Sequence, residues 1–154
     1  MAATAWTFPK HMKKNLGLGL IVFSAGVHWR MALFLSTALI SAAMATSTIG
    51  SLTNPVVSGN GYTALGGTKG LLTQTWLSGS SAGQWRFSFS SPRVFNASGG
   101  SISNVSFAVI YCSAGSAALK KTLCYSKLST ANFTVTTGNT LTITASGTGV
   151  FNLA

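Results

Sequence analysis

The sequence predicts an all-β protein, organised as a single-domain β-sandwich or jelly roll with a short N-terminal helix and arm. Three observations support this fold class. Short segments of alternating apolar and polar residues recur from Thr48 to the end of the chain, glycine-containing turns separate them, and serine and threonine are abundant throughout. A chain of 154 residues is the usual size of one domain, so we expect one core.

The N-terminal part is expected to differ from the rest. We assign residues 1–19 to an arm and a short helix, and residues 20–154 to the β-sandwich domain. The segment PKHMKKNLGLG places Pro9 where it suits a first helical turn, and Gly17 and Gly19 where a helix ends. The helix must therefore be short.

The apolar run from Met31 to Ala43 allows two interpretations. It follows Arg30 and resembles the core of a secretory signal peptide, but the chain ahead of it already exceeds the usual charged leader, since whole signal peptides have about 15–30 residues. The run is also shorter than the roughly 20 residues that span a bilayer. We predict a strand from Arg30 to Thr37, with a targeting segment as the alternative.

The segment WRFSFSS alternates between apolar and polar residues. Trp85, Phe87 and Phe89 fall on one face, which is the period-two pattern of a half-buried strand. We expect these three rings in the core.

The segment NVSFAVIYC is expected to form a central strand. Both of its faces are apolar, which is typical of a strand covered on both sides. Its first face carries Val105, Phe107, Val109 and Tyr111, and its second carries Ala108 and Ile110.

The segment NFTVTTGNTLTIT predicts a hairpin. Phe133 would face Ile143 and Val135 would face Leu141, so that both apolar pairs share one buried face. Thr137–Asn139 would form the loop. Other turns are expected at Gly59–Gly61, Gly66–Gly67 and Ser98–Gly100, and the last strand at GVFNLA.

Ten lysine and arginine residues stand against no aspartate or glutamate, a formal net charge of +10. This composition excludes chemistry that needs carboxylates, such as glycosidase pairs, Ser-His-Asp triads and oxygen-ligand calcium sites. The histidines, cysteines and lysines show no spacing that implies a shared site. We predict that the chain is not an enzyme and has no cofactor or metal site, with His11 on an exposed turn and His28 beside a strand start.

The two cysteines flank a predicted hairpin. The even separation of Cys112 and Cys124 allows a cross-strand disulfide, but the chain has no cysteine-rich framework and no Cys-x-x-Cys spacing. We predict two buried free thiols, with the disulfide as the alternative.

The unneutralised cations favour an anionic partner. They are spread along the chain and form no recognisable nucleic-acid motif, and solubility alone is the alternative explanation for them. Aromatic residues of the arm are a candidate tether to a neighbouring subunit. The predicted partner-binding residues are Trp6, Phe8, Arg30, Arg86, Arg93, Lys120, Lys121 and Lys127.

Five motifs follow one another along nearly the whole chain, from about Lys13 to Ala154. They are KKNLGLGL, RMALFLST, LTNPVVSGNGYTALGG, ASGGSISNVSFAVIY and TVTTGNTLTITASGTGVFNLA. This succession of strand and turn motifs resembles a family of small structural proteins of tailed bacteriophages. Relatives carry aspartates around the turns and after the ASGG segment, where this chain has Ser, Asn, Cys or Arg.

The resemblance implies a β-sandwich virion component, most closely a capsid cement or decoration protein. It implies the major capsid protein or other virion proteins as partners, a homo-oligomer or symmetric array on the particle, and a place in the virion after assembly in the host cytoplasm. No small-molecule substrate and no membrane are implied. The alternatives are a tail-associated adaptor or fibre-base protein, a basic nucleic-acid-binding protein, and a surface adhesin or secreted lectin.

Overall fold

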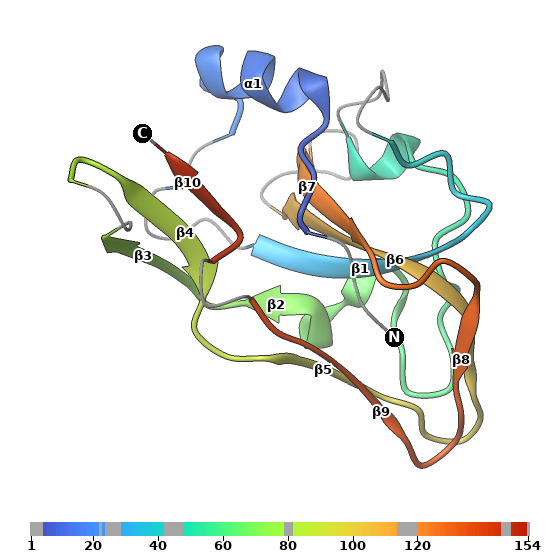
Figure 1. Ribbon diagram of the computed structural model, residues 1–154. Helices are drawn as coiled ribbons and strands as arrows, with labels where there is room; N and C mark the ends of the chain where they lie inside the picture. Colours follow the sequence, from blue (N-terminus) through green and yellow to red (C-terminus); the bar gives the residue numbers. More distant parts are fainter. Residues whose placement is uncertain are drawn as a thin grey trace.

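Antiparallel strands dominate the structure, a computed structural model that describes residues 5–21, 23, 29–41, 48–78, 82–113, 120–145 and 149–153 (Figure 1). The largest sheet has the order β2-β1-β6-β7, with β8 also paired to β6; a second has the order β10-β4-β3, and β5 pairs with β9. The chain is therefore all-β, as predicted. The elements are α1 (Lys10–Gly17), β1 (Trp29–Leu35), η1 (Ile49–Ser51), η2 (Ala64–Gly66), η3 (Thr68–Gly70), β2 (Leu71–Leu72), β3 (Gln74–Ser78), β4 (Trp85–Phe89), β5 (Arg93–Asn96), β6 (Ile102–Cys112), β7 (Thr122–Lys127), β8 (Phe133–Val135), β9 (Thr140–Ile143) and β10 (Phe151–Leu153).

Strand β6 is the centre of the largest sheet. It pairs with β1 along one edge and with β7 and β8 along the other. Every residue from Val105 to Cys112 is buried, because both faces of this strand are covered. The central strand predicted from NVSFAVIYC is confirmed, and so is the strand predicted from Arg30, which is β1.

A β-bulge changes which side chains of β6 share a face. Phe34 pairs with Phe107, but the next pair is Leu35 with Val105, so Ser106 is an extra residue in β6. One extra residue turns the following side chains to the opposite face. Val105 consequently packs in the core cluster on the other side of the sheet from Phe107. Simple alternation had placed these two side chains on the same face.

Two core clusters cover the two faces of β1 and β6. The first lies between this sheet and β3, β4 and β10, and the second lies under the segment that includes η1. Members of the first include Trp29, Met31, Leu33, Ala108, Ile110, Phe87 and Phe151. Members of the second include Ala32, Phe34, Ile49, Leu52, Phe107, Val109 and Tyr111.

Aromatic rings join the sheets within the first cluster. Phe87 of β4 lies 5.6 Å from the ring of Trp29 in β1, and 5.1 Å from Phe151 in β10. Trp76 of β3 lies 5.5 Å from Phe87. These contacts hold the three-stranded sheet against the larger one.

Most of the predicted core is confirmed, with three exceptions. Phe133 and Leu141 are half-buried at the edge of the first cluster. Trp85 was predicted inside and is 56% exposed, because it is the first residue of β4 and lies beyond the aromatic contacts made by Phe87. The residues confirmed as buried are Phe87, Phe89, Phe107, Val109, Tyr111, Val135 and Ile143.

The hairpin predicted between Phe133 and Ile143 is wrong. Strand β8 pairs with β6, and β9 pairs with β5. The chain from β5 to β6 and the chain from β8 to β9 bend together at one corner (Figure 1, lower right), where Ala97 N–H donates to Asn139 O at 3.0 Å and Gly138 N–H donates to Ala97 O at 2.9 Å. A bent two-stranded ribbon of this kind carries the chain from one sheet to another.

The outer edge of β1 is covered by a glycine-containing segment and a tyrosine. Gly66 and Gly70 lie against the carbonyl of Met31, where a Cβ on either glycine would collide with the oxygen. The Tyr62 hydroxyl accepts a hydrogen bond from Leu33 N–H at 2.9 Å. The outer edge of β1 is therefore covered at Met31 and Leu33, where it could otherwise pair with another strand.

The N-terminal residues pack on the same core as the β domain. Thr7 N–H donates to Tyr125 O at 2.7 Å, and Tyr125 N–H donates to Thr7 O at 3.0 Å, which adds the arm to the outer edge of β7. Helix α1 follows Pro9 as predicted, and its Met12 belongs to the first core cluster. Residues 5–19 therefore share the core of the β domain.

Replacing Gly66 by alanine should destabilise the protein, because the new methyl group would collide with the Met31 carbonyl. Gly66 has φ +79°, and Gly83 has φ +80° with no atom within 4 Å of an added Cβ. Gly83→Ala is therefore a control for backbone strain alone. We expect Gly66→Ala to lower the free energy of unfolding by about 1–3 kcal/mol more than Gly83→Ala, measured by urea denaturation. Equal losses would contradict the close approach.

Truncating Phe107 to alanine should cost roughly 3–5 kcal/mol of unfolding free energy, because the ring is buried in the second cluster. Trp85→Ala removes a larger but exposed ring and should cost less than about 1 kcal/mol. Thermal and chemical denaturation of the two variants provide the comparison. A Phe107→Ala variant with an unchanged melting temperature would show that this face is not buried.

The stability of the protein should fall as the pH rises from 10 toward 12. Burial raises the pKa of Tyr62 from 10.0 to about 12. The unfolded chain releases this proton near its ordinary pKa while the folded chain keeps it, so the unfolded state binds fewer protons in this range and is favoured as the pH rises. Burial also raises the pKa of Tyr111.

Urea denaturation across this pH range tests the effect, with Tyr62→Phe as the comparison. The variant should lose stability at neutral pH, because Leu33 N–H loses its acceptor, but its stability should decline less steeply above pH 10. The same slope in both proteins would show that Tyr62 is not responsible.

Candidate docking surface

The residues considered for catalysis are not assembled into a site in the part of the chain that the structure describes. Cys112 and Cys124 are free, buried thiols, as predicted, and burial raises the pKa of Cys124 well above its usual value. His11 lies in α1 and is half-buried, not on an exposed turn, and His28 lies outside the described residues. These residues include no group of three or more His, Cys, Asp or Glu that could hold a metal ion.

The side chain of Arg30 makes a hydrogen bond within the protein itself. It is half-buried in β1, and its Nη1 donates to the carbonyl of Gly67 at 2.9 Å. Beside it, the Tyr111 hydroxyl donates to the carbonyl of Leu65 at 2.8 Å. The two side chains hold the η2 and η3 segment over one end of the β1–β6 pair.

Arg93 has the same kind of role at another junction. It lies in β5, and its Nη1 donates to the carbonyl of Leu71 in β2. With no carboxylate in the chain, both arginines use backbone carbonyls as acceptors. Part of each guanidinium of these two predicted partner residues therefore serves the fold.

The other predicted cations are also half-buried. Arg86 lies in the middle strand of its sheet, paired with Leu77 of β3 and Asn152 of β10. The remaining three are half-buried in β7 or just before it, where Ile49 N–H donates to Lys120 O and Cys112 N–H donates to Lys121 O, both at 2.9 Å. These three are Lys120, Lys121 and Lys127.

The predicted aromatic tether packs on the chain itself. Trp6 and Phe8 are half-buried against the first core cluster, and the ring of Phe8 meets Phe151 edge-on at 5.2 Å. Their contact with a neighbouring subunit remains a prediction.

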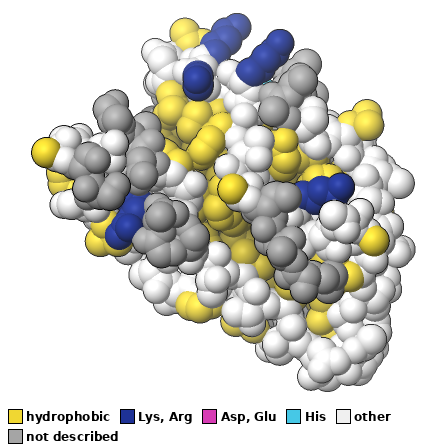
Figure 2. Space-filling model, viewed as in Figure 1, with side chains coloured by type: hydrophobic (Ala, Val, Ile, Leu, Met, Phe, Trp, Pro, Cys, Tyr) yellow, Lys and Arg dark blue, Asp and Glu magenta, His cyan; other side chains and the backbone are white. Residues whose placement is uncertain are grey.

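The exposed cations lie on α1. Among the cationic side chains that the structure describes, Lys10, Lys13 and Lys14 are exposed, whereas the others are half-buried. Figure 2 shows lysine and arginine side chains gathered over α1, with hydrophobic side chains below it. The sequence contained this signal, since residues at i, i+3 and i+4 of a helix share one face and a short helix was predicted here, but these lysines were not among the predicted partner-binding residues.

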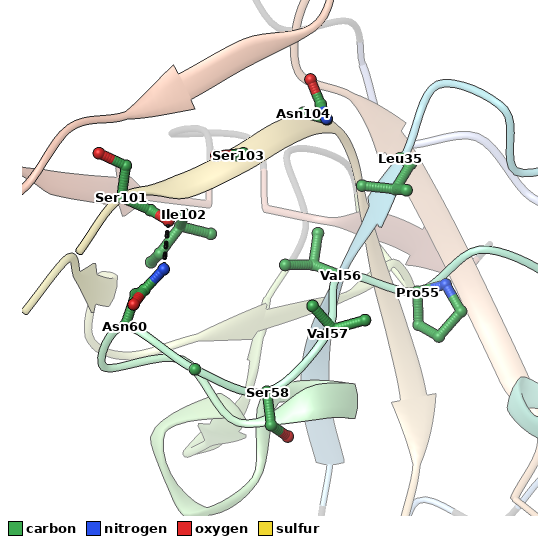
Figure 3. A pocket seen from close by; sticks show the side chains of 11 residues that line it. Leu35, Pro55, Val56, Val57, Ser58, Asn60, Ser101, Ile102, Ser103 and Asn104 are labelled. Atoms are coloured by element: carbon green, nitrogen blue, oxygen red, sulfur yellow. Dashed lines mark hydrogen bonds between the residues drawn. The ribbon is translucent and has the colours of Figure 1, made fainter. Parts of the chain in front are cut away.

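A hollow of about 230 Å³ lies between the 55–60 segment and the start of β6 (Figure 3). Leu35, Val56 and Ile102 form part of its apolar wall. Asn60 Nδ2 donates to the carbonyl of Ser101 at 2.7 Å and closes one end. The lining contains no charged or titratable side chain, so the hollow offers no group for acid–base chemistry or for an ion pair.

The described helices include none that is both long enough and apolar enough to cross a membrane. Comparison of the chain with protein-family models, with characterised proteins and with solved structures finds no match.

Proposed function

We propose that the chain is a structural virion protein, a capsid cement or decoration protein of the β-sandwich or jelly-roll type that binds the assembled head and stabilises it. The observation that carries the proposal is the charge: ten cations and no side-chain carboxylate. A protein of this composition cannot neutralise its own cations through ion pairs between side chains. Its field attracts an acidic partner.

The scaffold supports a binding role. The central strand is covered on both faces, and the edge of β7 is partly covered by Thr7 and Thr48, which form bridges to Tyr125 and Lys121. Covered edges limit unwanted strand pairing between copies. A scaffold of this kind can present side chains to a repeating surface.

The mechanism is electrostatic and thermodynamic. A cationic protein placed across acidic junctions between capsid subunits would reduce the repulsion between them. Because it would bind the assembled lattice and not the separated subunits, binding would stabilise the lattice by mass action. The protein would be assembled in the host cytoplasm, carried in the virion, and arranged as a symmetric array.

A tail-associated protein could use the same scaffold, so the copy number per particle separates the two. Quantitative mass spectrometry of purified particles should find a multiple of about sixty copies, the symmetry expected of closed shells. A small number such as about six or twelve would assign the chain to the tail. Absence of the chain from the particles would refute the proposal.

Association with particles should weaken as salt is added. The Debye length falls from about 10 Å at 0.1 M to about 3 Å at 1 M ionic strength, which screens the attraction between lysines and an acidic shell. Sedimentation of particles through a salt series measures the release. A protein that stays bound at about 1 M salt and leaves only in denaturant would contradict the electrostatic mechanism.

Binding to duplex DNA is the test of the nucleic-acid alternative. Affinity that persists at about 150 mM salt and falls steeply with more salt would favour that function over the proposed one.

A further inference from the structure

We infer that the outer side of α1 and the turn that follows it form the surface by which the protein docks on an acidic protein shell. This surface, the α1 face, consists of Lys10, Lys13, Lys14, Leu18 and Leu20. The inference rests on the proposed function and names the surface and the partner chemistry that serve it.

The three lysines lie together because of helical spacing. They occupy positions i, i+3 and i+4 of α1 and are all exposed. The opposite side of the helix is anchored, since Met12 and Asn15 are buried. The helix therefore presents three ammonium groups outward from a fixed base (Figure 2, top).

The turn after α1 holds two leucines outward. Gly19 has φ +67°, Gly19 N–H donates to Leu16 O at 3.0 Å, and Leu20 N–H donates to Asn15 O at 2.9 Å. This pair of hydrogen bonds is the Schellman arrangement that ends many helices. Leu18 N–H also donates to Lys14 O at 3.0 Å. The leucines are thus part of an ordered, hydrogen-bonded turn.

An apolar contact frequently accompanies this arrangement, between the residue after the glycine and the residue five or six positions before it. For Leu20 those positions hold Asn15 and Lys14, so the helix offers no apolar residue as a partner. Leu20 is 49% exposed and Leu18 is 60% exposed. Two apolar side chains therefore stand beside three lysines with no role in closing the helix.

The partner that suits this combination is a protein surface with carboxylates around an apolar patch. The phosphates of duplex DNA would attract the lysines, but the sugar-phosphate backbone offers no apolar surface for the two leucines to pack against. A bilayer would receive only these leucines, because Met12 on the inner side of α1 is already buried in the chain's own core. Even a whole myristoyl chain gives marginal membrane binding.

The size of the α1 face predicts weak binding by one copy. A helix of eight residues is about 12 Å long and about 10 Å wide with its side chains. Its outer side therefore covers an area on the order of 100 Å², which is small against the roughly 800 Å² per partner of a stable interface. Copies linked in an oligomer would gain avidity by engaging several equivalent sites of a repeating shell at once. Binding that is weak per site and reversible by salt is the behaviour expected of such a surface.

Two variants of equal charge test which cations dock. Lys10→Gln, Lys13→Gln and Lys14→Gln together lower the formal net charge from +10 to +7, and glutamine keeps the helix propensity of lysine. This triple substitution is the α1 variant. Lys120→Gln, Lys121→Gln and Lys127→Gln together, in β7 and just before it, lower the net charge by the same amount and are named the β7 variant. Each is mixed with purified particles that have been stripped of the native protein with about 1 M salt, and bound protein is measured by sedimentation at low salt.

We expect the α1 variant to bind the particles about tenfold more weakly than the β7 variant, a total of about 1.4 kcal/mol, or roughly 0.5 kcal/mol for each of three exposed ion pairs. Leu18→Ser with Leu20→Ser, at unchanged charge, should also weaken binding while leaving the salt dependence intact. Melting temperatures and circular dichroism of all three variants show whether the fold is kept. An α1 variant that fails to fold is replaced by Lys13→Gln with Lys14→Gln, and its control is then Lys120→Gln with Lys121→Gln, which removes the same two charges.

The possible outcomes are distinct. If wild-type protein does not rebind the particles, the proposed function fails. If wild type rebinds and both lysine variants lose affinity equally, or the β7 variant loses more, the α1 face is not the docking surface. Lysine-dependent binding to duplex DNA, or leucine-dependent binding to vesicles of phosphatidylcholine and phosphatidylglycerol, that exceeds binding to the particles would also overturn the inference and replace the protein partner with nucleic acid or lipid.

Discussion

The pairing of β1 with β6 is the interaction on which the rest of the structure depends. The two strands are antiparallel neighbours along almost the full length of β1, and each contributes buried side chains to both core clusters. A strand covered on both faces needs packing on each side. The three-stranded sheet with its aromatic residues packs on one side, and segments that include Ile40, Ile49 and Leu52 pack on the other. The elements that contribute to the two clusters are placed by how they cover this pair.

The lack of carboxylates imposes a second constraint. In most proteins arginines near the core are paired with acidic side chains. Here Arg30 and Arg93 donate to backbone carbonyls of Gly67 and Leu71, which satisfies part of each guanidinium and ties irregular segments to strands. The positive charge itself is not neutralised by these contacts, so it remains available to an external acidic surface. The same composition therefore shapes the fold and supports the proposed function.

The predicted hairpin failed for a reason that lies outside its own residues. The segment from Phe133 to Ile143 has the alternation and the central glycine of a hairpin, and its two strands exist. Each nevertheless pairs with a strand that is distant in sequence, because the chain between β5 and β6 bends at the same corner and offers a partner to each half. The exposed lysines of α1 were not among the predicted partner-binding residues, because the exposure of a side chain depends on what packs against it, and local sequence does not show this.

By itself the sequence determined the all-β class, the short helix after Pro9, the burial of both faces of β6 and the unneutralised charge, because these follow from local alternation, from helix-ending glycines and from composition. Tertiary structure alone decided the bulge at Ser106 that moves Val105 to the other face, the separation of β8 from β9, and the outward position of Leu18 and Leu20. The physical reason is that strand partners and exposed surface are set by contacts between residues far apart in the chain, which local periodicity does not encode.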